Sequence, residues 1–75
     1  MDNATFYNAL SRPCPVPIGS RIRLTHMPDD PDAIPYGSLG TVVGGNGAQV
    51  YVDWDNGRSL MLIPGVDQWQ VVQNA

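Results

Sequence analysis

Residues 50–62, VYVDWDNGRSLML, contain the pattern that decides the fold. Apolar and polar residues alternate on both sides of Asp55-Asn56-Gly57, as in two half-buried strands joined by a tight turn. A three-residue turn closed by a left-handed glycine places Val50 opposite Leu62, whereas a two-residue turn places it opposite Ile63. We favour the three-residue turn because it gathers the apolar side chains on one face. That inner face holds Val50, Val52, Leu60 and Leu62, and the outer face holds Tyr51, Asp53, Ser59 and Met61.

Further strands are expected on either side of this hairpin. Residues 21–25 alternate with a period of two, and a second strand at 39–43 is joined by a glycine-rich turn to the strand at 49–54. Residues 64–67 form a tight turn before a last strand at 69–72. Five short strands in this order, with a long proline-rich loop at 26–37 after the first, predict an all-β fold, a small five-stranded SH3-like barrel. The expected core is Ile22, Leu24, Val50, Val52, Leu60, Leu62 and Val71, sealed by Trp54 and Trp69.

The chain is long enough for one small domain, with 75 residues and a formal net charge of −3. Residues 1–18 are expected to form an N-terminal arm, with a helical turn at 4–10 that places Phe6 and Leu10 on one side. An extended path through three prolines follows. Residues 19–75 are expected to form the barrel.

Catalysis, metal binding and membrane insertion are all disfavoured. Cys14 and His26 are single and lie far from any partner of a nucleophile–base pair, so the sequence predicts no enzyme and no catalytic residue. A lone cysteine and a chain without glutamate predict no zinc or calcium site, and no motif predicts a cofactor. The longest apolar runs are about four residues, far short of the roughly 18 that span a membrane. These features are typical of a cytoplasmic protein.

Four segments carry a resemblance to known proteins. They are GSRIRL at 19–24, PYGSLGTV at 35–42, VDWDNGRSL at 52–60 and IPGVD at 63–67. Over residues 19–72 the chain resembles a family of short proteins of unknown function carried by phages and mobile elements. The phrase GSLGTV at 37–42 followed by WDNG at 54–57 is also similar to SH3-like modules near mind-bomb and HERC-type ubiquitin ligases. The resemblance implies an SH3-like fold and a small accessory protein in the cytoplasm of a bacterial host, without implying a particular chemistry.

The first hypothesis for the function is a non-catalytic binding protein, with a possible anti-defence role, that captures a host protein. An acidic loop at 29–32 would contact a basic partner, such as a nucleic-acid-binding defence factor. An exposed hairpin face with Tyr51, Met61 and Ile63 would contact the same partner or a second copy of the chain in a homo-oligomer. The alternatives are that the aspartates only form turns and that the arm covers the hairpin face. The residues nominated for partner binding are Asp29, Asp30, Asp32, Tyr36, Tyr51 and Met61.

The second hypothesis is an oligomer that sequesters a small cyclic nucleotide, since arginine grips phosphate and aromatic rings stack on bases. The nominated residues are Arg21, Arg23, Arg58, Tyr36 and Tyr51. The alternative is that Arg21 and Arg23 pair with aspartates across strands and that Arg58 covers Trp54. A structural or DNA-associated phage component is a third possibility. The net negative charge disfavours binding to long nucleic acid.

Overall fold

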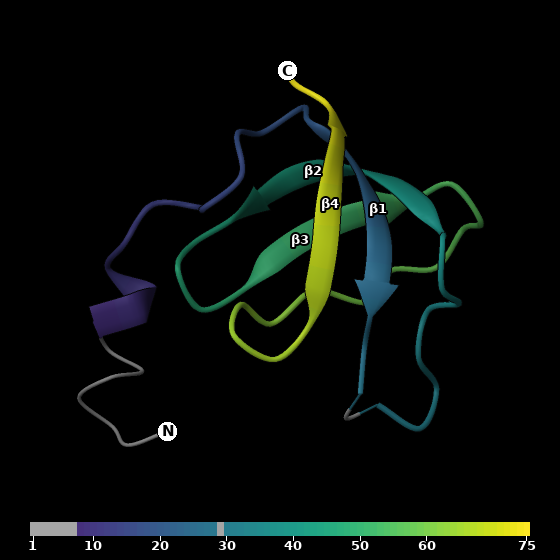
Figure 1. Ribbon diagram of the computed structural model, residues 1–75. Helices are drawn as coiled ribbons and strands as arrows, with labels where there is room; N and C mark the ends of the chain where they lie inside the picture. The colour runs from purple at the N-terminus through teal and green to yellow at the C-terminus, as the bar shows by residue number, and fades with distance from the viewer. Residues whose placement is uncertain (1–7, 29) are drawn as a thin grey trace.

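The computed structural model describes residues 8–28 and 30–75, and its regular structure is almost entirely β (Figure 1). All pairings are antiparallel, and the four strands form one open sheet in the order β3-β2-β1-β4. The predicted all-β class and the last strand are therefore confirmed. The strands are β1 (Arg21–His26), β2 (Leu39–Gly45), β3 (Val50–Trp54) and β4 (Gln68–Gln73).

The hairpin that follows β3 has the predicted three-residue register. Val50 and Leu62 form a bridge in which each N–H donates to the other residue's carbonyl, at 2.9 and 2.8 Å. Gly57 adopts a φ of 84° and donates its N–H to the Trp54 carbonyl, which closes the turn.

The second strand of the hairpin, expected at 58–62, is reduced to this single bridge, and the four-stranded sheet does not form a closed barrel. One reason lies in the side chain of Trp54. Its indole N–H donates to the Leu60 carbonyl at 2.7 Å, which gives that carbonyl a side-chain partner outside the strand ladder.

Alternation along the strands fills the core as predicted, with Ile22 and Leu24 inward on β1. Trp54 is also fully buried, whereas Leu60 and Trp69 pack against the core and stay half-buried. The prediction for Val71 was wrong, since its side chain is 41% exposed. β4 is an outer strand with β1 as its neighbour in the sheet, so its side chains gain less cover. The buried apolar residues that pack together are Val16, Ile22, Leu24, Ile34, Val42, Val50, Val52, Trp54 and Leu62.

The described part of the N-terminal arm packs on the domain. Val16 is buried in the core, Pro13 bridges Asn46, and the Gly47 N–H donates to the Arg12 carbonyl at 3.2 Å. Figure 1 shows the arm running beside the turn between β2 and β3. A helical turn occupies residues 8–10, while the start of the predicted helical segment, with Phe6, lies outside the described residues. In the part of the chain that the structure describes, no helix is long and apolar enough to cross a membrane.

Candidate functional site

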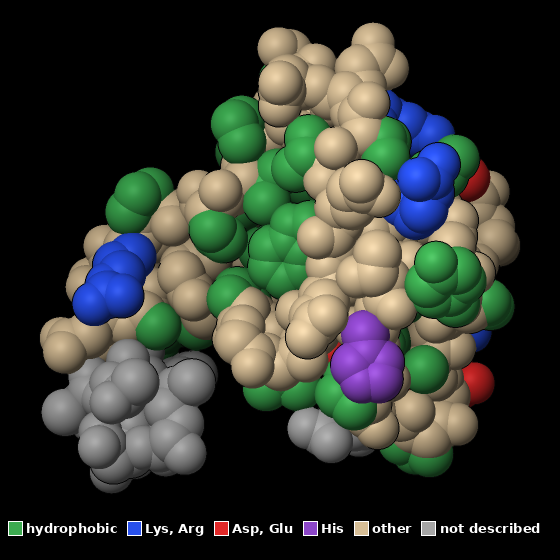
Figure 2. Space-filling model, viewed as in Figure 1, with side chains coloured by type: hydrophobic (Ala, Val, Ile, Leu, Met, Phe, Trp, Pro, Cys, Tyr) green, Lys and Arg blue, Asp and Glu red, His purple; other side chains and the backbone are tan. Residues whose placement is uncertain are grey.

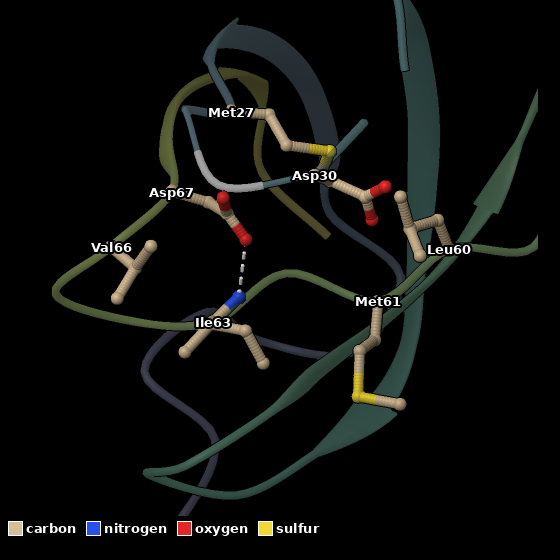
Figure 3. A pocket seen from close by; sticks show the side chains of 7 residues that line it. All are labelled: Met27, Asp30, Leu60, Met61, Ile63, Val66 and Asp67. Atoms are coloured by element: carbon tan, nitrogen blue, oxygen red, sulfur yellow. Dashed lines mark hydrogen bonds between the residues drawn. The ribbon is translucent and has the colours of Figure 1, made fainter. Parts of the chain in front are cut away.

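A cavity of about 280 Å³ lies between the long loop after β1 and the segment that follows the β3 hairpin. Figure 3 shows its walls, with Met27 and Asp30 coming from the loop and the other side chains from the segment before β4. Most of the lining is apolar, which suits the burial of an aliphatic group. The lining residues are Met27, Asp30, Leu60, Met61, Ile63, Val66 and Asp67.

Asp67 fixes one end of the cavity through a turn closed on Ile63. The Ile63 carbonyl accepts the N–H groups of Val66 and Asp67 at 3.0 and 2.9 Å. In return the Ile63 N–H donates to Oδ2 of Asp67 at 2.8 Å (Figure 3). Gly65 supplies the φ of 86° that this turn needs. The Asp67 carboxylate is thereby held in place although the residue is only 8% exposed.

The opposite wall is held by contacts of the acidic loop. Oδ1 of Asp30 accepts the Asp32 N–H at 2.8 Å, an Asx turn that orients the Asp30 side chain. The Arg58 guanidinium donates to the Asp32 carbonyl and lies 3.3 Å from its carboxylate, which ties the loop to the hairpin turn. Ile34, farther along the loop, is buried in the core. The loop is therefore anchored on both sides of its irregular path.

Two carboxylates thus border an apolar cavity. Among residues 8–28 and 30–75, the ion pairs are Arg21 with Asp55 and Arg58 with Asp32, so neither Asp30 nor Asp67 has a cationic partner there. Within the described part of the chain, each of these two carboxylates accepts one hydrogen bond through one oxygen. An ionised carboxylate offers about four acceptor positions, so both retain capacity for a donor.

The structure separates the residues nominated for partner binding. Asp30 and Met61 meet in the cavity, whereas Asp32 turns to Arg58. Tyr36 lies near the end of the loop, shortly before β2, with 81% of its surface exposed. The hydroxyl of Tyr51 donates to Oε1 of Gln49 on the outer face of β3. Asp29 lies outside the described residues.

The arginines nominated for a nucleotide have different surroundings. Arg21 binds Asp55 with two hydrogen bonds and also donates to Thr41, which matches the cross-strand pairing considered as the alternative. Arg58 binds the acidic loop. Arg23 is exposed on β1. On the face shown in Figure 2, one blue patch lies over the N-terminal arm, well apart from the blue side chains beyond β4. These positions provide no continuous basic surface on that face.

Four cavity residues were not proposed for partner binding from the sequence. Leu60 was assigned to the core, and Asp67 was interpreted as a turn residue, which it also is. A usable signal was the Pro64-Gly65 turn followed by an aspartate, because a carboxylate can accept backbone N–H groups there. Met27 and Val66 carried no comparable signal, since they lie in irregular segments without periodicity. Ile63 was expected, with Tyr51 and Met61, in an exposed apolar patch suited to a partner.

The fold and this site define a small all-β domain with an apolar, carboxylate-bordered cavity and, among residues 8–28 and 30–75, no cluster of three or more residues placed to hold a metal ion. Residues 15–72 match the family described as a domain of unknown function, DUF4314, and the chain belongs to this family. The match includes the buried Val16. No curated protein and no solved structure matches the chain.

Proposed function

We propose that this protein is a non-catalytic binding module that captures a partner protein through its acidic loop and hairpin segment. The cavity carries the proposal, because it brings Asp30 of the loop and Met61 of the hairpin to one surface. A concave apolar site with a few fixed polar groups is the usual form of a site for a small group, and here that group would be a side chain of the partner. The net charge of −3 favours a basic partner.

The finer fold assignment is an SH3-like module. The segment that contains Leu62 is bridged to β3. If this segment is counted as a strand, the sheet has five neighbouring segments. The resemblance to phage and mobile-element proteins supports an accessory role in a bacterial host's cytoplasm, directed at a host component such as a defence factor. In this role the protein occupies the partner's basic surface and needs no catalytic group.

A nucleotide-sequestering role has less support from the contacts. Arg21 and Arg58 already bind carboxylates, and Tyr51 is engaged by Gln49. Guanidinium groups held in this way must break an ion pair before they bind phosphate. A structural or DNA-associated role needs a basic surface, and the chain is net acidic.

The test is quantitative affinity purification from bacterial host cells with the full chain and two variants. Met61→Asp places a charge in the apolar cavity, whereas Gln70→Asp adds the same charge on the exposed β4 strand. We expect a host protein that is enriched by the wild type and Gln70→Asp, and at least about fivefold less by Met61→Asp. Circular dichroism establishes that both variants fold.

A partner enriched equally by both variants would place binding elsewhere and refute the proposed site. If no protein is captured, native mass spectrometry after incubation with host small molecules tests the nucleotide alternative. A bound mass of nucleotide size on an oligomer would replace protein capture as the function.

A further inference from the structure

We infer that the cavity accepts a cationic side chain with an aliphatic stem, a lysine or arginine presented by a segment of the partner protein. This inference rests on the proposed function and specifies the chemistry of its ligand. It combines the apolar walls with the two carboxylates that have no cationic partner among residues 8–28 and 30–75.

The walls suit the stem of such a side chain. Met27 and Met61 contribute unbranched thioethers, which adapt to the shape of an inserted group, and Leu60, Ile63 and Val66 complete the apolar surface. Lysine and arginine bury their methylene stems along apolar surfaces while the charged head reaches polar groups. The volume of about 280 Å³ is near the lower end for ligand pockets, which suits one or two side chains rather than a folded element.

The carboxylates suit the head of the side chain. Figure 3 shows the carboxylates of Asp30 and Asp67 both directed toward the segment 60–63, across the space between the walls. Asp67 is more than nine-tenths buried, and its one described partner is the neutral Ile63 N–H. A buried carboxylate is stabilised by a cation that replaces lost hydration. A neutral apolar ligand would instead cover these carboxylates without pairing them.

Two of the chain's own arginines are already paired with other aspartates and therefore do not neutralise Asp30 or Asp67. Arg58, the cation nearest in the chain to the cavity-lining segment, is held by Asp32. Arg21 is held by Asp55. The chain has four basic side chains in all and no lysine, so a partner is the natural source of the missing cation.

The experiment uses protein labelled with ¹³C at the methionine methyl groups, because Met27 and Met61 both line the cavity. The probes are a capped Gly-Arg-Gly peptide and the same peptide with citrulline, a neutral analogue of arginine of nearly the same shape. A matched pair with lysine and acetyl-lysine tests the other head group. We expect the cationic peptides to shift both methyl signals and to bind about tenfold more tightly than the neutral ones.

Three charge-neutralising variants test which carboxylates cause the tighter binding of cationic peptides. Asp30→Asn and Asp67→Asn keep an oxygen that can accept the Asp32 and Ile63 N–H groups, so the local structure is preserved while the charge is lost. Asp53→Asn makes the same charge change on the outer face of β3. We expect the first two variants to weaken the arginine peptide several-fold and Asp53→Asn to leave its affinity within about twofold.

Equal binding of charged and neutral peptides, or no methyl shift with any peptide, would overturn the inference. So would equal losses in all three variants, which would indicate a general charge effect. A host protein that is lost with Met61→Asp but retained by Asp30→Asn and Asp67→Asn would also overturn the cationic ligand. That last result would leave the proposed function intact, which separates the two claims.

Discussion

Arg21 and Asp55 form a two-bond ion pair across the width of β2. Nη1 of Arg21 lies 2.7 Å from Oδ1 of Asp55, and Nη2 lies 2.5 Å from Oδ2. Arg21 begins β1 and Asp55 directly follows β3, while Thr41 on the intervening β2 also accepts from Arg21 at 3.0 Å. The pair therefore connects the two strands that flank β2. It also occupies the Arg21 guanidinium, which the nucleotide hypothesis assigned to phosphate binding.

The first prediction concerns the pKa of Asp55. Hydrogen bonds from Arg21 lower this pKa most strongly, partial desolvation raises it by less, and the positive charge of Arg21 adds a smaller lowering. The substitution Arg21→Gln should raise the Asp55 pKa toward its ordinary value of about 3.9. Arg23→Gln, on the same strand, should leave it unchanged. Carboxyl ¹³C NMR titration of the three proteins measures the difference, and equal values in wild type and Arg21→Gln would contradict the assignment.

The second prediction follows from the sign of that shift. Because the folded pKa of Asp55 is lower than the unfolded one, its stabilising effect is complete above the unfolded pKa and is lost as pH falls through the folded pKa. Asp55→Asn should therefore reduce stability at pH 6 and flatten the loss of stability on acidification below about pH 4. Urea unfolding at pH 6 and pH 3 tests this, and parallel losses in both proteins would refute it.

The third prediction concerns Trp54, which is fully buried and donates its indole N–H to the Leu60 carbonyl. Trp54→Phe removes that donor and leaves a part-buried carbonyl without its partner. We expect a loss of about 1–3 kcal/mol in the free energy of unfolding from the carbonyl alone. Trp69→Phe, at a half-buried position on β4, should have a smaller effect. Urea unfolding followed by circular dichroism gives both values, and a larger effect at Trp69 would contradict the role of the indole.

The hairpin could be predicted from sequence because its alternation and its glycine turn both specify one register. The pairing of Val50 with Leu62 follows from those local features. The core contribution of Val16 and Ile34 was missed because both lie in irregular segments where periodicity gives no signal. Val71 was misplaced since alternation identifies a side of a strand but not whether another element covers it.

The cavity was largely beyond sequence-based prediction. It joins residues as distant as Met27 and Asp67, and that proximity depends on two irregular segments folding toward each other. Asp30 and Met61 were nominated for contact with the same partner, but the sequence did not show that their side chains line one cavity. The ion pairs of Arg21 and Arg58 likewise depend on tertiary contacts over 34 and 26 residues of sequence.

The fourth prediction compares Leu62, a core residue, with Val71, whose burial was wrongly predicted. Leu62 is fully buried and bridges β3, so Leu62→Ala should lower the free energy of unfolding by about 2–5 kcal/mol. Val71→Ala should lower it by less than about 1 kcal/mol because 41% of the residue's surface is already exposed. Equilibrium unfolding of both variants measures the contrast. Equal losses would indicate that β4 is covered in solution.

The last prediction tests whether Arg58 holds the acidic loop in place for the cavity. Arg58→Ala removes both the bond to the Asp32 carbonyl and the contact with its carboxylate. Asp32→Asn keeps the backbone carbonyl, so the loop should stay anchored in that variant. We expect lower backbone ¹⁵N order parameters at residues 30–33 in Arg58→Ala, near wild-type values in Asp32→Asn, and no change in Arg23→Ala. Because Met27 and Asp30 belong to this loop, Arg58→Ala should also weaken the arginine peptide at the cavity. Unchanged order parameters at residues 30–33 in Arg58→Ala would contradict the anchoring role.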